Sequence, residues 1–194
     1  MTGFRPPHIA SPIGDVTTPR LRLRRFRESD LDQLAAVFAK PEVWRYPYGR
    51  GFTRDETESF INTMIGEWQE CGFGCWIAIE KGTNEVVGYL GLSVPMFLPE
   101  ILPAVEVGWR LDPDHWGKGL ATEGARAALR EGFTTLGLDE ITSVPQSGNA
   151  SSSRVAERIG MRFARTVAIP ATDKRGELEG RLYTMSREEW LKCD

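Results

Sequence analysis

The chain has 194 residues, 41% of them hydrophobic, which is enough for one substantial core and short for two. Its formal net charge of -3 gives no general attraction to nucleic acid or anionic membranes, so any polyanion site has to be local. We see neither a secretory leader nor a run of about 18 apolar residues, and therefore expect a soluble cytoplasmic protein. Three cysteines and two histidines show no zinc-binding spacing, so we expect reduced thiols and no metal.

The N-terminal segment predicts an irregular arm followed by a strand. Residues 1–17 contain several prolines and glycines and no sustained hydrophobic period, so we expect an arm with a mobile tip ahead of a single domain at 18–194. Alternating leucines and arginines then predict a half-buried strand at 21–26.

Two helices are expected after this strand. The first begins at Ser29 or Asp30, and Pro41 ends it. The second is marked more strongly, because Thr53 and Glu56 form a capping-box pair ahead of an apolar stripe. The stripe consists of Phe60, Ile61, Met64, Ile65 and Trp68.

Short apolar runs replace the helical period in the middle of the chain. Runs at 75–80 and 86–94 predict a β-hairpin, and a third strand is expected at 104–111. A helix follows from about Gly119 and ends at Gly137.

The C-terminal part predicts one more helix between strands. A strand is expected at 141–144, a short helix from Asn149 to Ile159, and two final strands at 162–169 and 180–186.

The segment His115–Gly124, with the sequence HWGKGLATEG, joins a predicted strand to a predicted helix through glycines. Gly117 and Gly119 can adopt positive φ and let an anion approach the backbone. The unpaired amides and positive dipole end of the helix then favour a phosphate group, and Lys118 adds charge. The alternative is a turn that uses glycine for its geometry alone.

Two other phosphate-binding motifs fit this segment poorly. A P-loop needs Ser or Thr after Lys118, but Gly119 stands there, and Asp112 takes the place of the leading glycine. A dinucleotide fingerprint needs a third glycine or alanine at the position of Thr122, although Asp139 lies at the spacing of the ribose-binding acid. NAD binding therefore stays a weak rival.

Two segments carry a family resemblance, WRLDPDHWGKGLATEG at 109–124 and QSGNASSSRVAERIGM at 146–161. Together with the order of elements from Thr18 to Arg187, they resemble the GNAT N-acetyltransferases, particularly the branch of ribosomal-protein N-terminal acetyltransferases. The family motif places Arg or Gln, Gly, and Gly or Ala at positions 116, 119 and 121. The chain departs from it with Trp116, an aromatic residue that this branch commonly has there. The resemblance implies an α/β (α+β) fold with a mixed, mostly antiparallel central sheet flanked by helices.

The resemblance also implies acetyl-CoA as the cosubstrate, without a metal. Its pantetheine arm would lie along the strand at 109–111, its thioester carbonyl would meet a backbone amide near Trp109, and its pyrophosphate would rest on the amides of 117–122. The implied cofactor-binding residues are Trp109, Arg110, Leu111, Trp116, Gly117, Lys118, Gly119, Leu120, Ala121, Thr122, Asn149 and Ser152.

Two residues are candidates for proton transfer. Glu106 stands just before the carbonyl site, and an acid here acts as base in related enzymes, often through water; otherwise it is a solvated charge or an arginine partner. A microenvironment suited to a base would raise its affinity for protons. Relatives carry a tyrosine seven residues after Asn149 as the acid for the leaving thiolate, but Ala156 occupies this position. Ser152 is the replacement that the resemblance suggests, although Asn149 and Ser152 also suit a helix cap.

The acceptor is less visible in the sequence. We expect direct attack by an amine in a ternary complex, with a protein N-terminus or a small-molecule amine as acceptor; a weakly catalytic acyl-CoA sensor is the alternative from another class. A homodimer follows by analogy. The connection between the first two helices offers an aromatic wall for the acceptor, formed by Trp44, Tyr46, Tyr48 and Arg50, unless these side chains simply pack over the core. An acidic loop contains Asp173, Glu177 and Glu179 and suits a cationic acceptor, or is merely solvated.

Overall fold

The computed structural model describes residues 9–193, within which eight strands form one sheet in the order β1-β2-β3-β4-β5-β6-β8-β7. All neighbouring strands are antiparallel except β5 and β6, which run parallel. The strands are β1 (Val16–Thr17), β2 (Leu21–Arg24), β3 (Cys75–Glu80), β4 (Val86–Ser93), β5 (Glu106–Leu111), β6 (Glu140–Ser143), β7 (Arg162–Ile169) and β8 (Leu178–Ser186). The expected mixed, mostly antiparallel sheet is confirmed.

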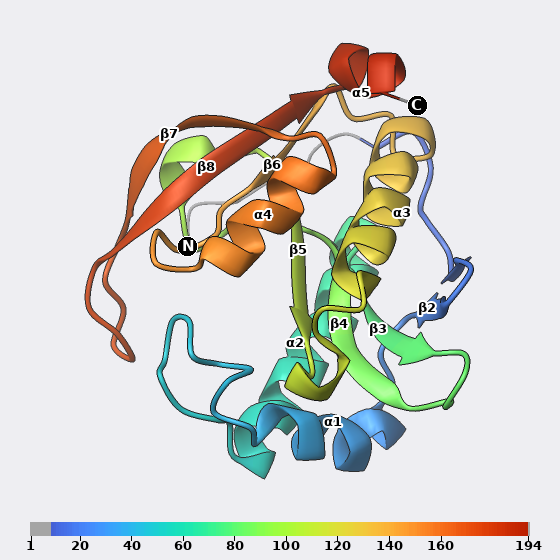
Figure 1. Ribbon diagram of the computed structural model, residues 1–194, viewed down its shortest axis with the longest axis vertical. Helices are drawn as coiled ribbons and strands as arrows, with labels where there is room; N and C mark the ends of the chain where they lie inside the picture. Colours follow the sequence, from blue (N-terminus) through green and yellow to red (C-terminus); the bar gives the residue numbers. More distant parts are fainter. Residues whose placement is uncertain (1–8, 194) are drawn as a thin grey trace.

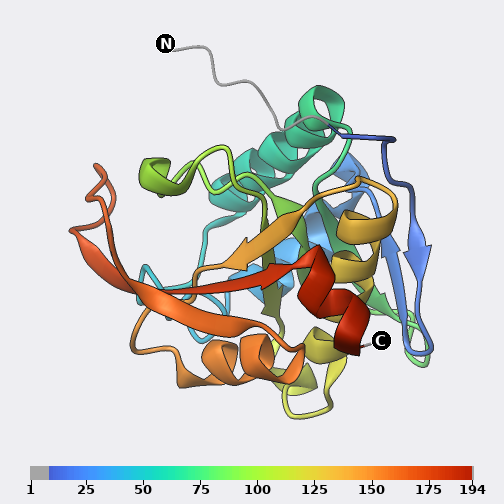
Figure 2. The ribbon, with the colours of Figure 1, turned by 90° about the horizontal axis from the view of Figure 1, so that it is seen from above.

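Five α-helices accompany the sheet within the same residues. They are α1 (Leu31–Phe38), α2 (Arg54–Cys71), α3 (Leu120–Thr134), α4 (Ala150–Arg158) and α5 (Arg187–Cys193). In Figure 1, α3 and α4 lie in front of the sheet, and Figure 2 shows α2 and α4 on opposite sides of it. The helices therefore bury both faces of the sheet, as the expected flanking arrangement requires.

Local signals explain where the predicted helices begin and end. Thr53 Oγ1 accepts a hydrogen bond from the Glu56 amide at 3.2 Å, and Glu56 accepts one from the Thr53 amide at 2.9 Å, so the capping box is confirmed. Gly72, at φ 73°, ends α2 in the left-handed conformation. The first helix starts with a 3₁₀ turn at Glu28–Asp30, and α1 proper begins at Leu31, slightly later than predicted.

Two elements differ from the expectation at the ends of the chain. Val16 and Thr17, expected in the irregular arm, form β1 against β2. Ile13 and Val16 are buried in the core, whereas Thr17 is exposed. The tip of the arm lies outside the described residues, and the division at residue 17 stays a prediction. Helix α5 was not predicted. It packs through Trp190, whose ring stacks on Phe133 at a centroid distance of 5.4 Å.

Two hydrophobic clusters fix the helices to the sheet. One joins α1 and α2 to the strands through residues that include Phe38, Ile61 and Ile77. The other lies mainly under α3 and α4 and includes Leu90 and Ala128. Within residues 9–193 no helix is both long and apolar enough to cross a membrane.

Candidate active site

The sheet opens between β5 and β6, which share a single residue pair, Glu106 with Thr142. The Thr142 amide donates to the Val105 carbonyl at 2.9 Å, so the Val105 backbone faces β6. Alternate residues of a strand direct their backbone groups to the same side, so the amide and carbonyl of Trp109 also face this side. No strand of the described residues pairs with β5 there. The result is a gap that widens from Glu106 toward Leu111.

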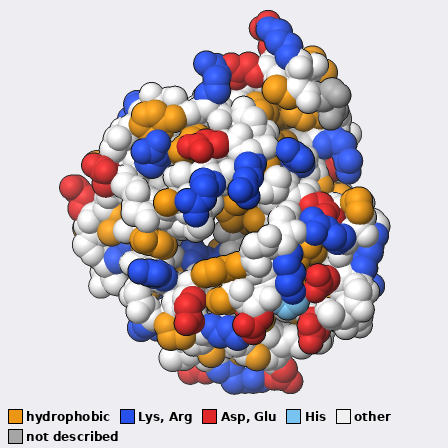
Figure 3. Space-filling model, viewed as in Figure 1, with side chains coloured by type: hydrophobic (Ala, Val, Ile, Leu, Met, Phe, Trp, Pro, Cys, Tyr) orange, Lys and Arg blue, Asp and Glu red, His pale blue; other side chains and the backbone are white. Residues whose placement is uncertain are grey.

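The surface is hollowed at this gap. Figure 3 shows the hollow near the centre of the view, between β5, the start of α4 and the connection between α1 and α2, with several Lys and Arg side chains around it. The positive charge around the hollow therefore favours a ligand that has an anionic end at the surface and its other end inside the gap.

The glycine turn lies at the wide end of the gap and leads into α3. Gly117 and Gly119 have φ of 73° and 78°, the left-handed conformation expected for these positions. Gly119 is the N-cap of α3, and no side chain of the described residues caps this helix end. The first amides of α3 are therefore free to bind an anion, and the exposed Lys118 lies beside them.

Arg20 neutralises the one acidic residue at this helix end. The Glu123 carboxylate accepts hydrogen bonds from Thr18 Oγ1 at 2.6 Å and from the Arg20 amide and Nε at 2.8 and 2.6 Å. Burial by itself raises the pKa of Glu123, but these hydrogen bonds lower it below its usual value. Arg20 Nη1 also donates to the Lys118 carbonyl at 2.6 Å. Sequence reasoning missed Arg20, because its partners lie about 100 residues away in the chain and no local pattern marks them.

Trp116 is hydrogen-bonded to the end of β5 through its indole ring. Its indole Nε1 donates to the Leu111 carbonyl at 2.8 Å, and its ring is 52% exposed. This hydrogen bond commits the polar group of Trp116 to the strand, so the ring offers a stacking surface at the glycine turn.

Glu106 stands at the narrow end of the gap, on the face of β5 that lies toward α2. The Ser93 hydroxyl donates to its Oε1 at 3.4 Å. Burial raises the pKa of Glu106 to about 8, the Ser93 hydrogen bond opposes this rise, and the Glu67 carboxyl adds to it. The raised proton affinity is the one expected of a base for an amine.

Arg110 is turned toward the connection between α1 and α2. Its Nη1 donates to the carbonyls of Val43 and Tyr46, the latter at 2.8 Å, and its guanidinium carbon lies 4.0 Å from the Trp44 ring centroid. The Tyr46 hydroxyl in turn donates to the Gly148 carbonyl at 2.8 Å. The connection thus bridges the gap from β5 to the segment before α4, and the Arg110 side chain positions this bridge.

The expected aromatic wall is mostly packing. Trp44 is 5% exposed and stacks on Phe52 with a centroid distance of 3.7 Å, and Tyr48 packs in the same cluster. Arg50 is paired with Glu56. Of the four residues, Tyr46 reaches the edge of the gap through its hydroxyl.

The start of α4 combines a helix cap with the second signature. Asn149 Oδ1 accepts hydrogen bonds from the Ser152 amide at 3.2 Å and the Ser151 hydroxyl at 2.8 Å, so the capping role is present. Ser152 is partly buried, one turn into the helix. Ala156 is fully buried in the core, so this position supplies no proton donor.

The acidic loop expected to attract a cation is an exposed turn between β7 and β8, except for Glu179, which lies in β8 and pairs with Ala168. It also contains Lys174 and Arg175, whose charges offset those of Asp173 and Glu177. A solvated turn is therefore a sufficient account of this loop.

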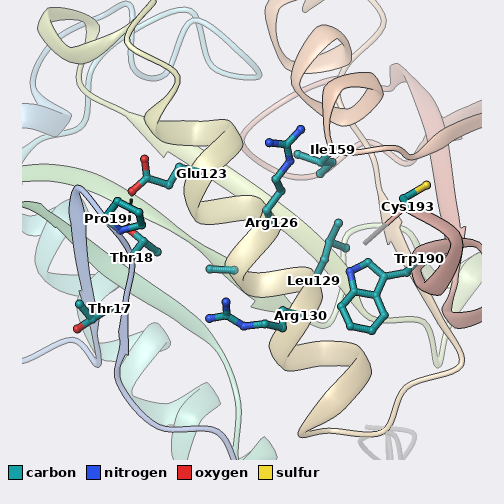
Figure 4. Close-up of a pocket in the computed structure, with 11 residues that line it drawn as sticks. Thr17, Thr18, Pro19, Glu123, Arg126, Leu129, Arg130, Ile159, Trp190 and Cys193 are labelled. Carbon is teal, nitrogen blue, oxygen red and sulfur yellow. Dashed lines mark hydrogen bonds between the residues drawn. The ribbon is translucent and has the colours of Figure 1, made fainter.

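A separate cavity of about 250 Å³ lies on the outer flank of α3. Figure 4 shows Thr18 and Glu123 on one side of it and Trp190 and Cys193 on the other, with Arg126 and Arg130 between them. None of the residues predicted to hold the cofactor lines this cavity.

Comparisons with known proteins agree with this geometry. The family described as Acetyltransferase (GNAT) domain matches residues 20–162. The uncharacterized protein YkkB of Bacillus subtilis is 34% identical over an alignment that covers 78% of this chain and 87% of that protein. The FsC-acetyl coenzyme A-N(2)-transacetylase of Aspergillus fumigatus is 32% identical, with 78% of this chain and 67% of the relative covered.

Among solved structures, a GNAT-family acetyltransferase from Bacillus anthracis is 27% identical and superposes with a TM-score of 0.74, covering 90% of this chain and 99% of that one. The family match, the identity to named transferases and the shared fold support the same conclusion. The chain belongs to the GNAT acetyltransferases and is an acetyl-CoA-dependent N-acetyltransferase.

Proposed function

We propose that this transferase moves the acetyl group from acetyl-CoA directly to a primary amine while both are bound in the gap between β5 and β6. The observation that carries the proposal is the single pairing of Glu106 with Thr142, which leaves the Trp109 backbone unpaired inside the sheet. The gap has a free helix end at its wide side and a carboxyl group at its narrow side.

Different residues around the gap bind the pyrophosphate and the pantetheine arm of acetyl-CoA. The amides of 117–122 hold the pyrophosphate, with charge from Lys118. The backbone at 109–111 pairs with the pantetheine arm as an added strand would, and the Asn149 side-chain amide donates to the same arm. This assignment uses Trp109, Leu111, residues 117–122 and Asn149 from the predicted set. The Arg110 backbone faces β4 and its side chain holds Val43 and Tyr46, so Arg110 positions the strand and does not contact the arm.

The chemistry needs a proton acceptor, an oxyanion donor and a proton for the leaving group. Glu106 accepts the proton of the ammonium group, directly or through water, and the Trp109 amide donates to the carbonyl oxygen as its charge grows. The amine nitrogen forms the new C–N bond and the C–S bond breaks. The second proton that the nitrogen loses then passes to the thiolate through the Ser152 hydroxyl or through water, so that Ser152 regains its proton. A pKa of about 8 lies near the pKa of the amine and leaves part of Glu106 ionised at neutral pH. This ionised part accepts the proton, so turnover should rise as the pH approaches 8.

The proposed acceptor is a primary amine. The name of the Aspergillus relative gives a nitrogen, N(2), as the atom that is acetylated, which supports an amine here. The aromatic Trp116 supports placement in the ribosomal-protein branch and hence a protein N-terminus. The alternative is a small-molecule amine. We place the protein in the cytoplasm.

Replacing Glu106 with Gln tests the central step. Free thiol is measured with acetyl-CoA and a panel of N-terminal peptides, polyamines, amino acids and aminoglycosides. With the best acceptor, Glu106→Gln should lower turnover at pH 7.5 by about 10²- to 10⁴-fold, because the ammonium proton loses its acceptor.

Calorimetric titration with acetyl-CoA is the control, and its affinity should stay within about twofold, because none of the contacts assigned to the cofactor involves this side chain. Preserved turnover in the variant would remove Glu106 as the base. Binding of acetyl-CoA without thiol release for any amine would favour a sensor.

A further inference from the structure

Glu67, on α2, holds the end of β4 immediately beside the contact that Glu106 makes. The Val94 amide donates to Glu67 Oε1 at 3.1 Å, and the Ser93 hydroxyl donates to Glu106 Oε1 at 3.4 Å. Two consecutive residues of the chain therefore bind the two carboxyl groups, one from the helix and one from β5.

No basic side chain of the described residues balances these carboxyl groups. Arg110 is the cation of this face, but its guanidinium is bound to the carbonyls of Val43 and Tyr46 and lies over the Trp44 ring. Within residues 9–193 no cation lowers the pKa of Glu67 or of Glu106.

The other titratable groups around the pair come from neighbouring strands and from the next turn of α2. Cys75 on β3 is buried, and both carboxyl groups raise the pKa of its thiol after the larger effect of burial. Tyr89 on β4 is enclosed beside Arg110, which donates to its hydroxyl at 3.3 Å. Glu70 adds negative charge on the Glu67 side. The surroundings of the pair are neutral or acidic on every element packed against it, except for Arg110.

A structural role explains the hydrogen bond of Glu67 but not its charge. A glutamine at 67 would accept the Val94 amide equally well through its side-chain carbonyl. A carboxyl group placed in this enclosed site without a cation costs free energy that an amide would not. Burial raises the pKa of Glu67 to about 7, so it changes charge in the same pH range as Glu106.

We propose that Glu67 and Glu106 form a carboxyl pair, in which Glu67 is a positioning residue whose negative charge makes the ionised Glu106 a stronger base for the proton of the acceptor amine. The inference rests on the proposed role of Glu106 and deepens it. When Glu67 is ionised, its negative charge favours the protonated state of Glu106, so the ammonium proton moves to Glu106 more readily and then leaves to solvent.

Glu67→Gln tests the pair without any acceptor. The titration of Glu106 is followed by NMR in protein labelled with ¹³C at the Glu carboxyl carbon, and its resonance is assigned by its loss in Glu106→Gln. The midpoint should fall by about half a unit or more in Glu67→Gln, because the neighbouring negative charge is gone.

Glu70→Gln is the matched control, since it removes an exposed carboxylate from the same helix and leaves the Val94 contact intact. In Glu70→Gln the midpoint of the Glu106 titration should shift less than it does in Glu67→Gln. An unchanged midpoint in Glu67→Gln, with the thermal midpoint and acetyl-CoA affinity of the wild type, would overturn the pair.

The acid limb of the turnover profile gives the second readout. It should move to lower pH in Glu67→Gln along with the NMR midpoint, and a limb that stays in place while the midpoint moves would overturn the positioning role. If Glu106→Gln keeps full turnover, the base assignment fails, and the NMR midpoints separate that failure from failure of the pair.

Discussion

Two glutamates at opposite ends of the gap have opposite electrostatic surroundings. Glu123, at the glycine turn, is held as a carboxylate by Thr18 and Arg20 and has a lowered pKa. No cation within residues 9–193 lowers the pKa of Glu106, and burial raises this pKa to about 8. One carboxyl group therefore serves as a fixed charge near the anion site, and the other remains able to exchange a proton.

The raised pKa of Glu106 predicts how stability depends on pH. In the unfolded chain this residue loses its proton near its ordinary value of 4.5, whereas the folded protein keeps the proton up to about pH 8. The folded state binds more protons between these values, so the free energy of unfolding falls as pH rises through this window. The Glu106→Gln variant should not show this fall in the free energy of unfolding.

Urea unfolding at several pH values between 5 and 8.5 measures the effect. The variant should lose a few kcal/mol less than the wild type across the window, because the amide does not titrate. Curves that stay parallel over the whole range would show that Glu106 has an ordinary pKa in the folded protein.

Helix α3 packs closely on the sheet, and this close packing decides where its first amides lie relative to β5. A methyl group added at Gly124 would lie 2.2, 2.8 and 3.0 Å from three side-chain atoms of Leu90, which is fully buried in β4. At Gly132 the nearest atom, Ile141 Cδ1, would be 2.5 Å away. Small residues on this face let the first amides of α3 lie beside the end of β5.

Gly124→Ala should therefore destabilise the protein by about 1 to 3 kcal/mol, since the core has no space for the methyl group. Gly66→Ala in the middle of α2 is the matched control. There a methyl group meets no atom within 4 Å, and alanine should stabilise the helix by about 0.5 to 1 kcal/mol. Chemical denaturation of both variants gives the comparison, and equal effects at the two positions would contradict the close approach of α3.

The elements that sequence could predict are those with local signals. Helix α2 was located by the Thr53–Glu56 pair, and the glycine turn by its spacing, because both depend on residues a few positions apart. Strand β1 consists of two residues, and its existence depends on pairing with β2, which no local period shows. The short helix α5 follows β8 without a break and was not predicted either.

The same distinction applies to the site. The segments proposed to bind the cofactor are visible as motifs in the sequence, whereas the partners that set the charge of the site are not. Arg20 meets Glu123 across 103 residues and Glu67 meets Val94 across 27, so only the folded chain brings them together. The tryptophan expected to face the acceptor, Trp44, belongs instead to a cluster of aromatic rings whose contacts are equally non-local.

The sheet of the whole molecule consists of two parts, and a single residue pair between strands joins them. Strands β1 to β5 form one part and β6, β8 and β7 the other, and the parts are paired through Glu106 and Thr142. Helix contacts and the bridge from Tyr46 to Gly148 add to this junction. The unpaired backbone of β5 is therefore open to exchange with solvent in the free protein, although it belongs to a central strand.

Acetyl-CoA should protect this backbone from hydrogen exchange. The Trp109 amide should exchange at least about tenfold more slowly with the cosubstrate bound, because it then has a hydrogen-bond partner, whereas the amides of 108 and 110 already lie in the β4–β5 ladder. Ile77, inside the β3–β4 ladder, provides an internal reference that should not change. Protection confined to the start of α3 would mean that acetyl-CoA does not lie along β5.

The single residue pair between β5 and β6 is the point about which the two parts of the sheet would turn relative to each other. If the two parts of the sheet turn relative to each other, residues move in proportion to their distance from Glu106, so the mouth of the gap widens while the carboxyl group scarcely moves. A bulky donor can then be admitted and released at the mouth while the reacting groups keep their geometry. The Tyr46–Gly148 hydrogen bond joins the connection between α1 and α2 to the segment before α4, so such a turn would have to break or strain it.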